Sequence, residues 1–175
     1  MKKMAWLAAA IWLACGQAAV ADPFKNVKCG AENIPKALIG QPSSNERTAV
    51  TEGKYRALGL KHLGADEKSE QLSSINWLIC GKEYIMLVDR QGLVRDVIEF
   101  PPHSKTSPAY SGMCKLNGQE LPDIFEAVLN AKVAGDELPA LSAWKVDLDA
   151  AKFVKAPTAG LRCPRDGVYT VDAGR

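Results

Sequence analysis

The chain has 175 residues, of which 47% are hydrophobic, with 22 basic and 20 acidic side chains and a formal net charge of +2. This length is normal for one domain, and the hydrophobic share is large enough for one core. Charges of both signs are interspersed along the chain, so we expect no basic surface and exclude nucleic acid as a partner.

The first 21 residues have the three-part pattern of a secretory signal peptide. Two lysines precede an apolar run over residues 5–14, and the sequence Ala-Val-Ala ends at Ala21. The run is shorter than the roughly 20 residues of a membrane-spanning helix, so we expect no stable membrane insertion. The pattern predicts a periplasmic or secreted protein with a single mature domain over 22–175. A lipidated Cys15 is the alternative, because Leu-Ala-Cys-Gly resembles a lipoprotein cleavage box.

The exported part contains four cysteines, none of them at a Cys-x-x-Cys interval. An even number in an oxidising compartment indicates two disulfides, and the wide spacing argues against a metal site. Four cysteines allow three pairings, and counting does not choose among them. We favour Cys80 with Cys114 and Cys29 with Cys163, which would bracket the central strands and tie the two ends together.

The N-terminal third is expected to hold the first helix. Residues 43–46 have the Ser-x-x-Glu form of a capping box, which predicts a helix over about 44–58. Gly53 interrupts the apolar stripe of this helix. The next segment, 64–70, is polar and charged, so we expect a surface loop there.

Three strand-forming runs follow over 75–80, 83–89 and 93–100. They are rich in β-branched and aromatic residues, and turn residues at 81–82 and 90–92 separate them at hairpin spacing. The pattern predicts an antiparallel meander. Because the middle run is almost continuously apolar, we expect that strand to lie centrally with both faces covered.

The C-terminal half is predicted to contain a loop, a second helix and short strands. Prolines and hydroxyls make 101–113 a loop. Apolar residues at helical spacing predict a helix over 121–132. Strands are expected at 144–148, 152–155 and 168–171. The predicted fold class is therefore α+β, with a mainly antiparallel sheet, two helices and two disulfides.

The loop over 101–113 is the candidate binding element. Its prolines restrict the backbone, and a restricted loop loses little entropy on binding. Its candidate binding residues are Pro102, His103, Ser104, Lys105, Thr106 and Tyr110. The common catalytic motifs are absent from the sequence, so we name no catalytic residue, metal or cofactor. A catalytic site could be built around His103 only if the fold brought an acid or hydroxyl beside it.

Two segments carry a family resemblance. Cys29 with Ala-Leu-Ile-Gly-Gln at 37–41, and Leu-Val-Asp-Arg-Gln-Gly-Leu-Val at 87–94, resemble the skeleton of small bacterial exported serine-protease inhibitors related to potato inhibitor I. The resemblance covers less than half of the chain, and no reactive-site residue is carried over from it. It implies a protease as the partner.

Three classes of function remain. An exported, non-catalytic binding protein is favoured by the small size, the disulfides, the balanced charge and the lack of catalytic motifs. Its partner would be another protein, such as a protease or lysozyme that it inhibits. A small hydrolase using His103 is one alternative. An accessory component of an envelope assembly is the other, for which a large exposed apolar patch would be the sign.

Overall fold

The computed structural model describes residues 22–44 and 46–170, so the predicted signal peptide and the end of the predicted strand 168–171 lie outside the described residues. The helical elements are α1 (Ile34–Leu38), α2 (Thr48–Lys54) and the 3₁₀ helix η1 (Arg56–Leu58). The strands are β1 (Lys61–Ser69), β2 (Leu72–Ile79), β3 (Lys82–Asp89), β4 (Val94–Glu99), β5 (Ala109–Leu116), β6 (Gln119–Leu129), β7 (Glu137–Asp147), β8 (Lys152–Ala156), β9 (Leu161–Pro164) and β10 (Val168–Tyr169).

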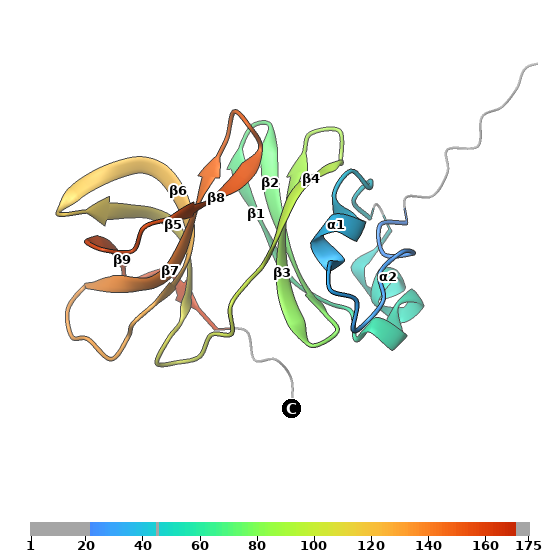
Figure 1. Ribbon diagram of the computed structural model, residues 1–175, viewed down its shortest axis with the longest axis horizontal. Helices are drawn as coiled ribbons and strands as arrows, with labels where there is room; N and C mark the ends of the chain where they lie inside the picture. Colours follow the sequence, from blue (N-terminus) through green and yellow to red (C-terminus); the bar gives the residue numbers. More distant parts are fainter. Residues whose placement is uncertain (1–21, 45, 171–175) are drawn as a thin grey trace, which may run out of the picture.

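The strands form two antiparallel sheets. The first has the strand order β1-β2-β3-β4, and the second has the order β10-β5-β6-β7-β8. The first sheet lies between the helices and the second sheet (Figure 1). One hydrophobic cluster joins the helices to the first sheet, and another joins the two sheets through Ile85, Phe100, Ala109 and Val128. The predicted α+β class, with antiparallel pairing, two α-helices and two disulfides, is confirmed.

β3 lies inside the first sheet, as its apolar run predicts. It pairs with β2 on one side and β4 on the other, and six successive residues from Glu83 to Val88 are buried. Tyr84 and Met86 belong to the cluster with the helices, whereas Ile85 belongs to the cluster between the sheets. Because side chains alternate along a strand, both faces of β3 are covered by protein.

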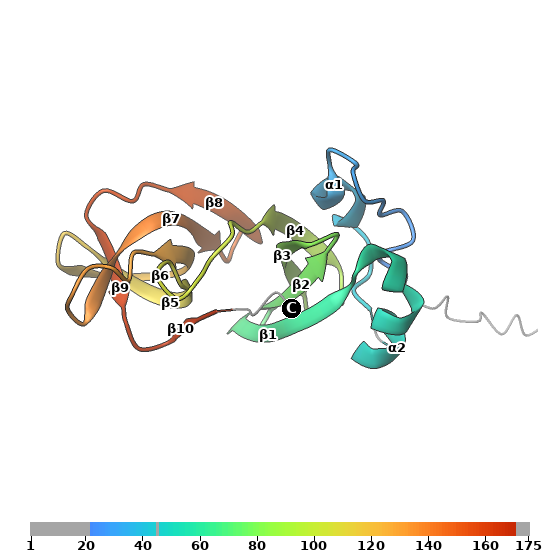
Figure 2. The ribbon, with the colours of Figure 1, turned by 90° about the horizontal axis from the view of Figure 1, so that it is seen from below.

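Four strands of the second sheet close into a ring. β5 pairs with β6, β6 pairs with β7, and β9 pairs with both β7 and β5. The ring surrounds a hydrophobic cluster that includes Phe125, Leu129, Leu138 and Leu161. β10 leaves this ring and runs toward β1 of the first sheet (Figure 2). The course of β10 brings residues from the end of the chain to the junction of the sheets.

The first predicted helix is shorter than expected. α2 covers 48–54, and the other described residues of the predicted 44–58 helix are irregular apart from η1. The predicted capping box would make Ser43 the N-cap, but Arg47 occupies that position. The Ser44 hydroxyl contacts the Thr51 hydroxyl at 2.8 Å, so it supports the helix through a side chain in its second turn.

The second predicted helix, over 121–132, is wrong. Residues 119–129 form β6, and this strand is buried on both faces at its C-terminal end. Phe125 and Ala127 pack inside the ring, whereas Val128 packs against the first sheet. A strand that is apolar on both faces does not alternate, so its apolar spacing resembled that of a helix.

The predicted surface loop over 64–70 is also wrong, because β1 continues to Ser69. β1 is an edge strand, and irregularities after His62 and Glu67 interrupt its pairing with β2. Edge strands carry polar and charged side chains that discourage further pairing, which is why this strand resembled a loop. The predicted 101–113 loop ends early, since β5 begins at Ala109.

The disulfide pairing that we favoured is wrong as well. Cys29 is bonded to Cys80, and Cys114 is bonded to Cys163. The first bond ties the N-terminal segment to the end of β2, and the second joins β5 to β9 within the ring. Two disulfides fit an oxidising compartment. None of the described helices is long and apolar enough to cross a membrane.

We expect mass spectrometry of the unreduced, digested protein to recover a peptide linking Cys29 to Cys80 and another linking Cys114 to Cys163. Replacing either pair by alanine should lower the free energy of unfolding by about 4 kcal/mol, because each bond constrains a large loop of the unfolded chain. Urea unfolding of the two double variants measures this loss. A peptide linking Cys80 to Cys114 would contradict the pairing.

Candidate functional site

Four of the six predicted binding residues are exposed on one loop. This linking loop, residues 101–108, connects β4 of the first sheet to β5 of the second. Its exposed members are Pro102, Ser104, Lys105 and Thr106. Tyr110 lies in β5 and is buried, and its hydroxyl donates to the Met113 carbonyl at 2.7 Å. Tyr110 therefore supports β5 from inside, away from the exposed surface of the loop.

The tip of the linking loop is closed by its own hydrogen bonds. The Ser104 N–H donates to the Ser107 carbonyl at 2.9 Å, and the Ser107 N–H donates back at 3.1 Å. Their hydroxyls are 3.0 Å apart. The Ala131 N–H donates to the Thr106 carbonyl at 3.1 Å, which fixes the tip to the β6–β7 connection. These contacts hold the loop in one conformation.

His103 anchors the linking loop to the interior. Its imidazole is only 6% exposed and makes edge contacts with the rings of Phe100 and Tyr169. Nδ1 lies 3.4 Å from the Pro101 carbonyl oxygen and 3.5 Å from Oε2 of Glu83. The fold thus supplies the carboxylate partner that the sequence did not reveal, in a hollow of about 200 Å³ lined by both side chains.

The surroundings change the acidity of both groups. The pKa of the Glu83 carboxyl is raised to about 7, mainly by burial; a hydrogen bond from Asn76 opposes the shift, and the nearby charge of Glu126 adds to it. Burial lowers the pKa of His103, and its contact with the Pro101 carbonyl partly offsets that effect. Near neutral pH the fold therefore favours an uncharged Glu83 and an uncharged His103.

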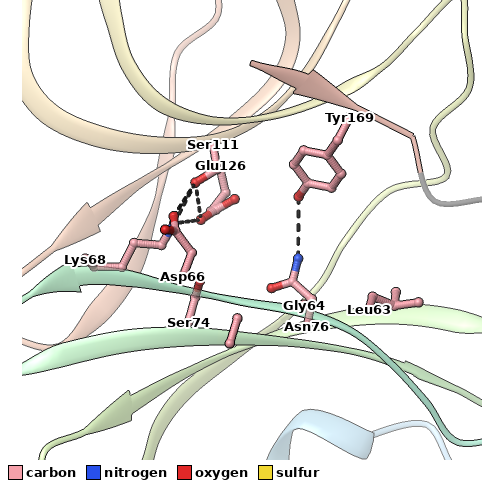
Figure 3. Close-up of a pocket in the computed structure, with 10 residues that line it drawn as sticks. Leu63, Gly64, Asp66, Lys68, Ser74, Asn76, Ser111, Glu126 and Tyr169 are labelled. Carbon is pink, nitrogen blue, oxygen red and sulfur yellow. Dashed lines mark hydrogen bonds and ion pairs between the residues drawn. The ribbon is translucent and has the colours of Figure 1, made fainter.

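A second hollow lies between the two sheets. This inter-sheet pocket has a volume of about 300 Å³ (Figure 3). The first sheet contributes β1 and β2, and the second contributes β5, β6 and β10. Its polar lining residues are Asp66, Lys68, Ser74, Asn76, Ser111, Glu126 and Tyr169. Residues separated by up to about a hundred positions in sequence therefore share one polar space.

Lys68 is the most constrained charge in this pocket. Its side chain is 1% exposed, and its ammonium group contacts Glu126 at 2.6 Å and Asp66 at 2.7 Å. It also donates to the Ser111 hydroxyl, which lies 3.1 Å from Oε1 of Glu126. Glu126 is as buried as Lys68, whereas Asp66 is 61% exposed. A charge pair that spans the two sheets is thus buried at their junction.

Asn76 connects the inter-sheet pocket to the buried pair of Glu83 and His103. Its amide donates to Oε1 of Glu83 at 3.2 Å and to the Tyr169 hydroxyl at 3.4 Å. Burial raises the pKa of the Tyr169 hydroxyl, and the negative charges of Glu126, Glu83 and Asp66 raise it further. The junction of the sheets therefore holds one continuous set of polar side chains.

Sequence reasoning missed the residues of the inter-sheet pocket. The sequence predicts a surface loop at Lys68 and a helix at Glu126, without a site at either position. The signal that could have found Glu126 is its place in an otherwise apolar run, where a charged side chain needs a buried partner. Nothing in the sequence identifies that partner as Lys68. Among residues 22–44 and 46–170, no group of three or more potential ligand side chains could hold a metal ion.

We expect Lys68→Met to lower the free energy of unfolding by about 3–5 kcal/mol, because it leaves the buried Glu126 carboxylate without its counter-charge. The double variant Lys68→Met/Glu126→Leu should recover much of that loss. Lys82→Met is the matched control, since it removes an ion pair to Glu99 that is exposed and worth at most about 1 kcal/mol. Equal losses in Lys68→Met and Lys82→Met would contradict the assignment.

Glu83→Gln should stabilise the protein at alkaline pH. Because the folded-state pKa of this acid is raised from 4.5 to about 7, the parent loses stability as the pH rises through that interval. The variant does not have this loss. The free energy of unfolding of the variant, relative to that of the parent, should therefore rise by up to about 3 kcal/mol between pH 4 and pH 8. Urea unfolding at both pH values measures it. Glu99→Gln, at a more exposed carboxyl on the neighbouring strand, is the control.

Comparison of the chain with protein-family models, with curated proteins and with solved structures found no match.

Proposed function

We propose that this chain is an exported, non-catalytic binding protein, periplasmic or secreted, that recognises another protein through the exposed tip of the linking loop. The observation that carries the proposal is the closed tip between Ser104 and Ser107, which presents exposed side chains above the buried anchor His103. The two disulfides support the compartment, since they persist in oxidising surroundings.

A loop with this construction suits recognition. Backbone hydrogen bonds fix the tip before a partner arrives, so little conformational entropy remains to be lost on binding. Lys105 and Thr106 stand at the tip with exposed side chains. Inhibition of a protease or lysozyme is the version of this function that we favour, because a fixed, protruding loop can occupy an enzyme's cleft without rearranging.

The test is the residual activity of a panel of serine proteases and lysozymes incubated with micromolar oxidised protein. We expect stoichiometric loss of activity for one enzyme. Lys105→Ala and Thr106→Ala should each raise the inhibition constant by about tenfold or more, because a few central side chains carry most binding energy.

The control is Lys61→Ala, which removes an exposed lysine from β1 instead of the loop. It should inhibit like the parent. No inhibition of any enzyme in the panel would reject the inhibitor version, and equal effects of Lys61→Ala and Lys105→Ala would reject the loop as its site.

A small hydrolase is the second candidate. It is favoured by the Glu83 carboxyl group, which lies 3.5 Å from the imidazole of His103 in a shared hollow and is ionised once the pH exceeds its raised pKa of about 7. In this version His103 acts as a general base and Glu83 orients it. We rank it second because the imidazole is almost completely covered. Turnover of chromogenic esters that is lost in His103→Gln would establish it over the binding function.

A further inference from the structure

We propose that the inter-sheet pocket binds an organic cation, a primary ammonium or guanidinium group, with the Asp66 carboxylate as its main charged contact. This site is distinct from the linking loop, and the inference does not depend on the partner that the loop recognises.

The strong donors of the pocket have their acceptors. A lysine ammonium has three N–H donors, and Lys68 faces three acceptor groups, in Asp66, Glu126 and Ser111. The Asn76 amide has two N–H donors, which point to Glu83 and Tyr169. An anionic ligand would therefore find neither donor available.

Acceptors, in contrast, are in excess. Asp66 makes both of its contacts through Oδ2, and Glu126 makes both of its contacts through Oε1. Within the described part of the chain, the second oxygen of each carboxylate has no hydrogen-bond partner. Asp66 is also 61% exposed, so a ligand can reach it. The two carboxylate oxygens without a partner are best satisfied by a ligand that donates hydrogen bonds, while the hydroxyls of Ser74 and Tyr169 can serve as donors or acceptors.

The net charge of the pocket side chains also favours a cation. When both are ionised, Asp66 and Glu126 together outweigh the single positive charge of Lys68; burial raises the pKa of Glu126, and the ammonium of Lys68 opposes that shift. Glu83 lies behind Asn76 and adds a further negative charge when it is ionised. The aromatic ring of Tyr169 lines the same space, and such rings attract cations (Figure 3). A volume of about 300 Å³ is at the lower limit for small-molecule sites, so the pocket admits one head group of this kind.

The experiment is a titration of the oxidised, isotope-labelled protein followed by amide NMR shifts, with butylammonium and ethylguanidinium as probes. Butanol and butyrate are the controls of matched size. We expect saturable shifts at Gly64, Ala65 and Tyr169 with both cations, affinity at least tenfold weaker for butanol, and no saturable shift with butyrate. Equal binding of butanol and butylammonium, or no saturation with either cation, would overturn the proposal.

Two neighbouring acids of β1 provide a matched pair of variants. Asp66 lines the inter-sheet pocket, whereas Glu67 lines a separate hollow together with Ser73 and Arg90. Asp66→Asn should weaken butylammonium binding at least fivefold, and Glu67→Gln should leave it unchanged. Both residues are exposed, and thermal unfolding checks that both variants remain folded. Equal weakening would mean that net charge alone attracts the cation, which would reject the site.

The same chemistry could come from a free amine or from a basic side chain of a partner. Titration with a capped Gly-Lys-Gly peptide separates the two sources. If the peptide shifts the same three residues at least as strongly as butylammonium, the ligand is a side chain. If only the free amine binds, the ligand is a small molecule. Neither variant alters the linking loop, so failure here leaves the proposed function untouched.

Discussion

Burying β3 on both faces requires two covering layers, and the rest of the fold supplies them. The helices and the N-terminal segment cover Tyr84, Met86 and Val88, whereas the second sheet covers Ile85. Neither the helices nor a four-stranded sheet alone could remove this apolar surface from water. The order of layers, with a sheet between helices and a second sheet, follows from where the most apolar strand lies (Figure 1).

The contact between the two sheets is apolar in one part and polar in another. Phe100, Val128 and Trp144 fill the apolar part, and the pair of Lys68 and Glu126 marks the polar part. Apolar side chains tolerate sliding, but a buried charge pair is satisfied in only one arrangement. The pair therefore has its clearest role in fixing how the sheets meet.

Much of the first sheet was predictable because its signals are local. The short connections at 80–81 and 90–93 separate runs whose composition suits only strands, and turn residues mark both of them in the sequence. The second sheet was less predictable, since the burial of β6 on both faces comes from its neighbours in space. β1 was missed for the opposite reason, because an exposed edge needs no apolar pattern.

In the candidate site, too, some features could be predicted from the local sequence and others could not. The linking loop could be found from its prolines, and four of its predicted residues are exposed. The partner of His103, by contrast, is twenty positions away in β3, and no local pattern connects the two. The inter-sheet pocket draws on five strands, so only the folded chain brings its side chains together. Patterns of neighbouring residues do not predict these contacts, because only the tertiary structure brings the side chains together.

The two disulfides join cysteines in the order in which they occur, the first to the second and the third to the fourth among Cys29, Cys80, Cys114 and Cys163. A chain that enters an oxidising compartment N-terminus first presents Cys29 and Cys80 before either of the other two. An oxidant that joins each new thiol to the one already waiting then produces the native pairing directly. For a chain exported as we propose, no exchange between mispaired sulfurs is needed, and its assembly then places little demand on a disulfide isomerase.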